Sequence, residues 1–309
     1  MRRRVSARAP VTSRRRVLGL GLAGVGPAAL GLSAGCRARP TPTDEESPVP
    51  RYRYGDHPSQ YAELSLPAGT GRVPVVVVVH GGFWRDAYDA ELGRPLAADL
   101  VPRGWAALVV EYRRVGSSPT DGGGGWPQTA LDVAAAVDGL AGPGQERAGG
   151  RLDLDRVVAL GHSAGGQLAG WLAARPGLPA GAPGAGPAVR LRGFVAQAGV
   201  LDLVTAAREG VGGAAVPDLM GGGPDARAAD YALASPTARL PLGVPSVCVH
   251  GTADSTVPHR QSAAFVAAAR AAGDVSELRS CAGDHFEPVT VGSDAWALCT
   301  DALDGLLAG

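Results

Sequence analysis

Residues 157–166 read Val-Val-Ala-Leu-Gly-His-Ser-Ala-Gly-Gly, an apolar run followed by a serine between two glycines. The residues from there to Ala174 are rich in alanine and leucine, which favour a helix. This order predicts a strand, a tight turn and a helix, with Ser163 at the tip of the turn. Gly161 and Gly165, two positions to either side, allow neighbouring backbone to pass closely. The serine hydroxyl would then be pushed into open space.

Short apolar runs alternate with helix-like segments on both sides of this stretch. The apolar runs lie at 75–79, 106–112, 157–160, 194–198 and 246–250, with a weaker one at 275–278. The helix-like segments lie at 86–101, 127–140, 164–174, 260–272 and 294–307. Val75–Val79 is unbroken valine, which indicates a strand that is buried on both faces. The alternation predicts an α/β fold with a mostly parallel central sheet and helices on both faces.

The first 36 residues have the pattern of an export signal. Ser13-Arg14-Arg15-Arg16-Val17-Leu18 resembles a twin-arginine signal, and an uncharged run follows it to Gly35. The run ends at Leu32-Ser33-Ala34-Gly35-Cys36, which resembles a lipobox except that Ser33 stands where an aliphatic residue is usual. We expect Cys36 to be lipidated and to hold an exported protein at the cell surface. A secreted soluble product and an uncleaved anchor are the alternatives.

The remainder of the chain predicts one domain on a tether. Residues 37–50 contain four prolines and are expected to be flexible, and residues 51–309 are expected to fold as one α/β unit. The 309 residues are 45% apolar and 19% charged, as is typical of globular proteins. Without the first 36 residues, 22 arginines and no lysine stand against 29 acidic residues, a formal charge of −7. Such a body has no patch suited to a phosphate backbone, so we expect no nucleic-acid partner.

The cysteines do not indicate a metal site. Cys248, Cys281 and Cys299 have neither CxxC spacing nor an adjoining histidine pattern, so we expect no zinc or other metal. Cys248 lies in an apolar run and is expected to be a small buried side chain. A disulfide between Cys281 and Cys299 stays open as an alternative in an exported protein.

Ser163 needs a base and an acid if it is to act as a nucleophile, and these follow it in the order acid, then histidine, on this kind of scaffold. Asp254 follows the apolar run 246–250, and His285 follows the run 275–278. Both should emerge at the carboxyl edge of the sheet, where Ser163 also emerges. Asp202 is an alternative acid, and His259 is an alternative base. His80, His162 and His250 precede Asp254 and are expected to form hydrogen bonds that stabilise loops.

A negatively charged intermediate on Ser163 would need backbone donors. His80-Gly81-Gly82-Phe83-Trp84 follows the valine strand directly, and its glycines allow amides to face a substrate. We expect one donor from Ala164, the residue after the serine, and the other from Gly81 or Gly82. The N-terminus of the helix behind Ser163 adds a partial positive charge.

These motifs resemble the α/β-hydrolases of the esterase/lipase type, especially the group with kynurenine formamidases and bifunctional feruloyl and acetyl xylan esterases. The similarity covers roughly residues 73–307. The motifs that carry it are His80 to Trp84, Glu111-Tyr112-Arg113, Gly161 to Gly166, His250 to Asp254 with Val257-Pro258, and His285-Phe286. The resemblance implies a catalytic triad of Ser163, Asp254 and His285. Many relatives carry a third glycine where Phe83 stands, so Phe83 or Trp84 is expected to line the acyl pocket.

The expected activity is hydrolysis of carboxylic esters through an acyl-enzyme, without a cofactor. The expected substrate is a small-molecule or carbohydrate-linked ester, and the excursion between residues 200 and 241 is expected to roof the site. Two alternatives stay open. One is an amide-directed relative, such as an arylformamidase or a peptidase, and the other is a catalytically silent binding module on the same scaffold.

Overall fold

The computed structural model describes residues 49–308. The predicted export signal, with Cys36, and all but the last two residues of the predicted tether lie outside this range. Within residues 49–308, no helix has the length and apolar character that crossing a membrane requires.

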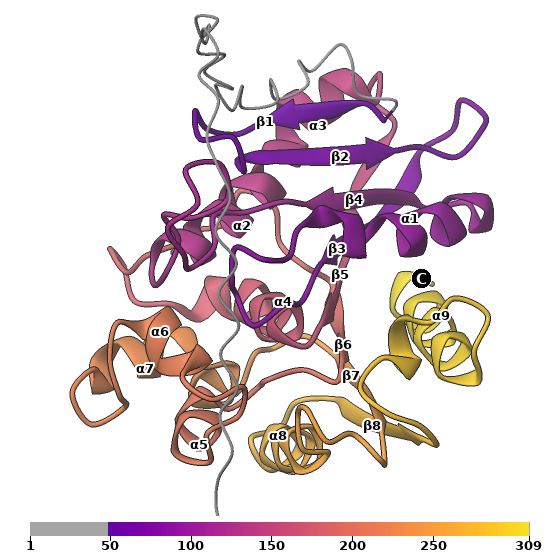
Figure 1. The fold of residues 1–309 in the computed structure, drawn as a ribbon. Helices are drawn as coiled ribbons and strands as arrows, with labels where there is room; N and C mark the ends of the chain where they lie inside the picture. The colour runs from indigo at the N-terminus through magenta and orange to yellow at the C-terminus, as the bar shows by residue number, and fades with distance from the viewer. Residues whose placement is uncertain (1–48, 309) are drawn as a thin grey trace, which may run out of the picture. The chain divides into compact units, whose positions relative to one another are not determined.

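An eight-stranded, mostly parallel sheet forms the centre of the described chain (Figure 1). Its strand order is β1-β2-β4-β3-β5-β6-β7-β8. The parallel strands are β3 (Val73–Val79), β4 (Ala106–Val110), β5 (Leu152–His162), β6 (Gly193–Gln197), β7 (Ser246–Gly251) and β8 (Ser276–Cys281). The six predicted strands are therefore confirmed. The sequence reasoning missed β1 (Arg51–Arg53) and β2 (Tyr61–Ser65), which add to β4 in antiparallel fashion.

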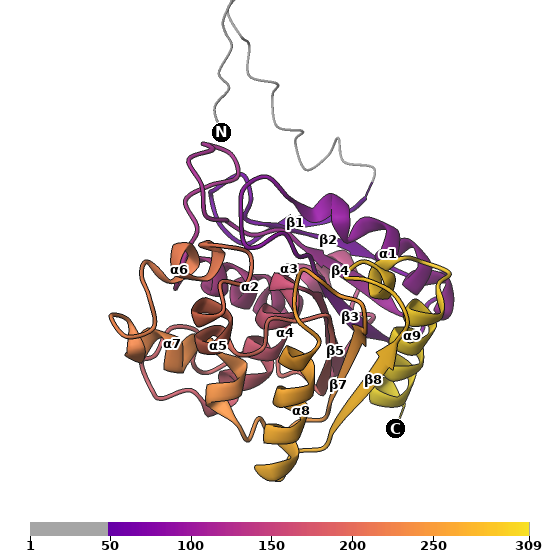
Figure 2. The ribbon, with the colours of Figure 1, turned by 60° about the horizontal axis from the view of Figure 1, so that its bottom comes forward.

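Helices cover both faces of the sheet, as expected (Figure 2). One face carries α1 (Arg94–Leu100) and α9 (Asp294–Leu307), which share a core with Val76 and Val78. The other carries α2 (Gln128–Asp138), α4 (Ala164–Ala174) and α8 (Arg260–Ala271), whose core includes Val75, Val77 and Val79. A strand with an apolar layer on each face needs apolar residues at every position, which explains the unbroken valine run. The short α3 (Pro143–Arg147) precedes β5.

The predicted helix over 86–101 is shorter in the structure. A 3₁₀ turn (Ala90–Leu92) comes first, and α1 begins only at Arg94 with Pro95 in its first turn. Proline suits a helix start because its missing N–H has no intrahelical partner there. Asp86 is instead used in the loop, where its carboxylate accepts a hydrogen bond from the amide of Ser118 at 3.0 Å.

The excursion between β6 and β7 holds three short helices, α5 (Leu203–Arg208), α6 (Ala215–Met220) and α7 (Ala228–Ala234). It packs against the loop after β3. The contact is close, since a side chain at Gly212 would collide with the Phe83 ring. Arg85 Nη2 also donates to the carbonyl of Gly212 at 3.4 Å. The excursion therefore contacts the loop after β3, but none of its residues lines the cavity beside Ser163, so the expectation that it roofs the site is wrong.

Cys248, Cys281 and Cys299 are all free, so the alternative of a Cys281–Cys299 disulfide is not supported. The Cys299 thiol, on buried α9, instead donates to the carbonyl of Pro288 at 3.6 Å. Cys248 is fully buried in β7, as predicted.

Candidate active site

Ser163 occupies the strained turn that the sequence predicts between β5 and α4. Its backbone has φ 55° and ψ −115°, a left-handed conformation that is costly for a residue with a side chain. The Ser163 amide donates to the carbonyl of Gln197 at 2.8 Å, which ties the turn to β6. A Cβ at Gly161 would lie 2.1 Å from the Gly165 carbonyl oxygen, and one at Gly165 would lie 2.1 Å from that of Val79. Only glycine fits at these two positions, and the packing around them maintains the strain.

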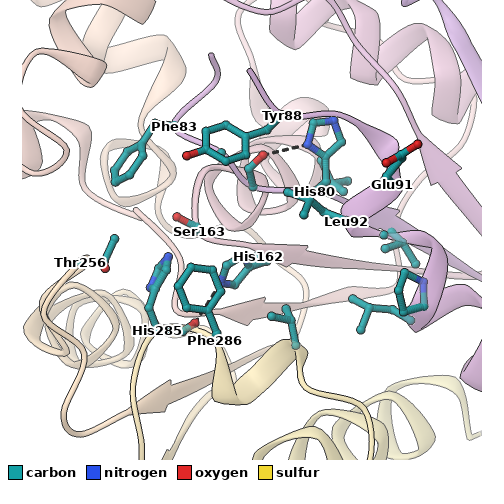
Figure 3. A pocket seen from close by; sticks show the side chains of 18 residues that line it. His80, Phe83, Tyr88, Glu91, Leu92, His162, Ser163, Thr256, His285 and Phe286 are labelled. Carbon is teal, nitrogen blue, oxygen red and sulfur yellow. Dashed lines mark hydrogen bonds between the residues drawn. The ribbon is translucent and has the colours of Figure 1, made fainter. Parts of the chain in front are cut away.

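Asp254 and His285 meet at the same edge of the sheet. Asp254 follows β7, His285 follows β8, and His285 Nδ1 donates to Asp254 Oδ2 at 2.7 Å. The imidazole of His285 and the hydroxyl of Ser163 line one cavity (Figure 3). The structure therefore brings together the three residues that the sequence selected from separate loops.

The Asp254 carboxylate is fully buried and accepts four hydrogen bonds. His250 Nε2 donates to Oδ2 at 3.0 Å, beside His285, and the amides of Thr256 and Val257 donate to Oδ1 at 2.8 and 2.9 Å. Burial alone would raise the pKa of Asp254, but the hydrogen bonds from His250, His285 and Val257 lower it well below its ordinary value. Asp254 is thus an ionised acceptor that keeps a proton on His285 Nδ1.

The glycines after β3 lie directly against Ser163. A Cβ at Gly81 would lie 3.1 Å from Ser163 Cβ, and Gly82 has φ 108°, which only glycine adopts readily. The amide of Ala164 is at the first position of α4, where no intrahelical acceptor exists. Of the predicted donors, Gly81 and Ala164 therefore adjoin the serine, and Gly82 lines the same cavity as Ser163.

A cavity of about 330 Å³ opens beside Ser163 and His285. Phe83, Tyr88, Leu92, Thr256, Phe286 and Val289 are among the residues that line it. Phe83 lines the cavity, and its assignment to an acyl pocket stays a prediction, whereas Trp84 does not line the cavity and its assignment is wrong. Trp84 is completely buried, and its Nε1 donates to Gln167 Oε1 at 3.0 Å beneath α4. Phe83 and Trp84 both have positive φ, at 54° and 55°, so the backbone turns between the cavity and the core.

Comparison with known proteins places the chain in a family. The model of the BD-FAE family matches residues 63–268, about two thirds of the sequence. The chain belongs to the BD-FAE family. This confirms the resemblance that the sequence motifs indicated. Asp254 lies inside the matched region, whereas His285 lies beyond its end, so that position rests on the geometry of this structure.

Curated relatives of this chain are named as esterases. The curated "Probable carboxylic ester hydrolase LipM" of Mycobacterium tuberculosis is 30% identical over 203 residues, 64% of this chain and 45% of LipM. Esterase LipQ of the same organism is 31% identical over 208 residues, 65% of this chain and 47% of LipQ. The chain thus spans less than half the length of these curated relatives.

Solved structures share the fold of this BD-FAE chain. A bifunctional GH43-CE protein of Bacteroides eggerthii superposes with a TM-score of 0.70 at 24% identity, over 84% of this chain and 35% of that one. The butyrate-bound esterase Est2 of Thermogutta terrifontis superposes with a TM-score of 0.63 at 23% identity, over 80% of this chain and 90% of that one. At this identity, the likeness establishes the α/β-hydrolase fold alone.

The two alternative site residues of this BD-FAE chain have other tasks. Asp202 caps α5, where its carboxylate accepts from the amide of Thr205 at 3.1 Å and from its hydroxyl at 2.7 Å. His259 Nε2 pairs with the hydroxyl of Ser280 at 2.8 Å, outside the cavity lining. Neither is placed to serve Ser163.

His80, His162 and His250 were expected to stabilise loops, and each contacts residues around the cavity. His162 Nε2 donates to the carbonyl of His285 at 3.0 Å, and burial and the neighbouring His285 lower the pKa of His162 to about 3, so it is neutral. His250 Nδ1 pairs with the hydroxyl of Ser262 at 2.8 Å, opposite its bond to Asp254. His80 stacks on Tyr112 with 4.4 Å between the ring centroids.

A buried ion pair of Glu111 and Arg114 contacts the segment that follows β3, and the sequence reasoning did not identify it. Glu111 and Arg114 are buried at 2.8 Å from each other, and Glu111 Oε2 accepts from the amide of Ala90 at 2.7 Å. Tyr112 donates through its hydroxyl to the carbonyl of His80 at 2.8 Å. The motif Glu111-Tyr112-Arg113 is visible in the sequence, but its contacts with residues 21 and 32 positions earlier in the chain are not.

Proposed function

We propose that this chain is a carboxylic ester hydrolase in which Ser163, His285 and Asp254 act as a catalytic triad through an acyl-enzyme. The observation that carries the proposal is the 2.7 Å bond from His285 Nδ1 to an ionised Asp254, with Ser163 on a strained turn in the same cavity. The esterase names of the curated relatives support it.

The roles follow from the protonation states. Asp254 holds the proton on Nδ1 of His285, so the other ring nitrogen is free to take the proton of the Ser163 hydroxyl. Ser163 then attacks the ester carbonyl, and the protonated His285 gives its proton to the departing alcohol. Water repeats the sequence on the acyl-enzyme, with His285 first as base and then as acid, and releases the carboxylic acid.

The amides of Ala164 and of Gly81 or Gly82 would stabilise the negative charge on the carbonyl oxygen. Donors fixed in a glycine turn and at a helix start need no reorganisation when that charge forms. Removal of one such donor in other hydrolases costs about 2.7–4 kcal/mol of transition-state stabilisation. The role of Glu111 and Arg114 is then to hold the loop that carries them.

Covalent labelling tests the proposal. The full chain, purified in mild detergent, is treated with a fluorophosphonate and weighed intact, and turnover of p-nitrophenyl butyrate is measured in parallel. We expect the native chain to gain one phosphonyl group and to turn over the ester, and the Ser163→Ala chain to do neither. Thr256→Ser, a conservative change at the edge of the cavity, serves as a control that should still be labelled.

Other results would support the alternatives. Labelling together with faster turnover of an aryl formamide than of the matching ester would favour an amide-directed enzyme. A folded native chain that takes no label and turns over neither substrate would favour the silent binding module.

A further inference from the structure

The cavity beside Ser163 extends well beyond the reacting groups. Besides Ser163 and Gly82, its lining includes Leu92, Pro95 and Leu96 at the start of α1, and Val289. We call the part lined by Tyr88, Leu92, Pro95, Leu96 and Val289 the α1 arm. Its side chains are apolar apart from the Tyr88 hydroxyl. Glu91 also lines the cavity, and its carboxylate is exposed and paired with Arg94 at 3.3 Å.

The mouth of the cavity is apolar as well. The described residues include six large apolar side chains that are more than a third exposed, and three of them, Tyr88, Leu92 and Phe286, line this cavity. Their exposed fractions are 45%, 49% and 60%. Single exposed apolar residues are ordinary, but a group that continues an apolar cavity to the surface marks a place where apolar ligand atoms bind.

The direction of the α1 arm assigns it to one half of the ester. His285 must give its proton to the departing alcohol, so the alcohol leaves on the side of Ser163 where His285 lies. In Figure 3, His285 and Thr256 lie on that side, whereas Tyr88 and Leu92 lie across Ser163 from them. The acyl group therefore points into the α1 arm.

We propose that the α1 arm binds an unbranched aliphatic acyl chain, so that the preferred substrates are esters of medium-chain fatty acids and not acetyl esters. This inference rests on the proposed function. An acetyl group has one methyl to bury and would leave most of a cavity of about 330 Å³ without contacts. Each further methylene placed against Leu92, Leu96 and Val289 is worth about a fourfold gain in kcat/KM.

The test is a chain-length series of p-nitrophenyl acetate, butyrate, hexanoate and octanoate on the full chain. We expect kcat/KM to rise at least tenfold from acetate to hexanoate. Leu92→Gln should lower the hexanoate-to-acetate ratio about fourfold, because it removes apolar contact at the mouth. Leu131→Gln is the matched control, an exposed leucine (38%) on α2 outside the cavity lining, and should leave the ratio unchanged.

A second variant fills the α1 arm from the other wall. Val289→Trp should reduce hexanoate and octanoate turnover more than acetate turnover, and so lower the ratio at least as much as Leu92→Gln. A native enzyme that is labelled by a fluorophosphonate yet prefers acetate would overturn the acyl assignment while the proposed function stands. The same holds if Leu92→Gln and Leu131→Gln give equal ratios. A native chain without label or turnover would instead remove the proposed function itself.

Discussion

The Asp254 carboxylate lies within a buried chain of hydrogen bonds that begins away from the cavity and ends at His285. Ser262 pairs with His250 Nδ1 at 2.8 Å, His250 Nε2 donates to Asp254 at 3.0 Å, and Asp254 accepts from His285 at 2.7 Å. His250 is completely buried, so its orientation is fixed by these bonds and not by solvent. It positions the proposed acid without contacting a substrate.

Replacement of His250 tests this positioning role. His250→Leu keeps most of the volume but removes the donor to Asp254, and we expect kcat/KM for p-nitrophenyl butyrate to fall about 10- to 100-fold. His250→Gln retains an amide donor and should recover part of the loss. Urea unfolding of both variants controls for folding. Equal activity of the leucine and glutamine variants would contradict a role through the hydrogen bond.

His162 makes the stability of the protein dependent on pH. Its pKa is lowered to about 3 in the folded protein and returns to the ordinary 6.5 on unfolding. Because the unfolded chain then binds the proton more readily, the stability is complete above pH 6.5 and is lost as the pH falls from 6.5 toward 3. Between pH 6.5 and 4.5 this single group accounts for about 2–3 kcal/mol.

The variant His162→Gln, whose side chain does not titrate, tests the predicted pH dependence of stability. Its free energy of unfolding in urea should fall about 2–3 kcal/mol less than that of the native chain between pH 7 and 4.5. The carboxylates whose pKa values are lowered, such as Asp254 and Asp153, contribute in both proteins and cancel in the comparison. Parallel curves for the two proteins would show that His162 does not titrate on unfolding.

Sequence reasoning found the site residues that directly follow strands. It did not find side-chain positions that are set by the folded backbone. Ser163, Asp254 and His285 each follow an apolar run, so the parallel sheet alone predicts that they meet. Asp254 is the predicted acid, and Asp202 stays as its alternative because a helix-capping carboxylate and a triad carboxylate look alike in sequence. Trp84 was placed in the cavity wrongly, because the direction of its side chain depends on a left-handed backbone that the sequence does not reveal.

At the scale of elements, the contact between β3, β5 and α4 decides where the serine lies. Gly165 and Gly305 are both helical glycines, but a Cβ at Gly165 would meet the Val79 carbonyl at 2.1 Å and one at Gly305 would meet nothing within 4 Å. Gly165→Ala should therefore destabilise the protein by about 1–3 kcal/mol or more. Gly305→Ala should stabilise it by up to about 1 kcal/mol.

Opposite signs of these two substitutions in thermal or urea unfolding would establish that crowding, and not helix propensity, requires glycine at 165. If Gly165→Ala were as stable as Gly305→Ala, the close approach of β3 to α4 would be incorrect. Activity should follow the same order, because a displaced α4 moves Ser163 and the Ala164 amide together.

The elements with strong local signals were predicted well, and those with weak signals were not. The valine strand β3 and helix α9 agree with their predicted ranges within two residues at each end. Strands β1 and β2 are three and five residues long, and they exist because they pair with each other and with β4. Such short strands owe their conformation to the partner strand, which a pattern along one segment cannot reveal.

At the scale of the whole molecule, the described domain and the first 48 residues have separate tasks in our proposal. The domain contains both the proposed catalytic triad and the α1 arm proposed to bind the acyl chain. We propose that the preceding segment exports the chain and that lipidated Cys36 holds it at a membrane.

Detergent phase separation of the full chain, expressed in a host with the export and lipidation machinery, tests this arrangement. We expect the native protein to enter the detergent phase and a Cys36→Ser chain to stay in the aqueous phase if its signal is cleaved, because the lipid contributes the apolar surface. Intact mass should show that the mature native chain begins at Cys36 with a lipid attached. An N-terminus at Met1 would indicate the uncleaved anchor, and a native chain in the aqueous phase would indicate a secreted product. Equal kcat/KM for p-nitrophenyl butyrate in both chains is expected in each case, because every residue assigned to the chemistry lies within residues 49–308.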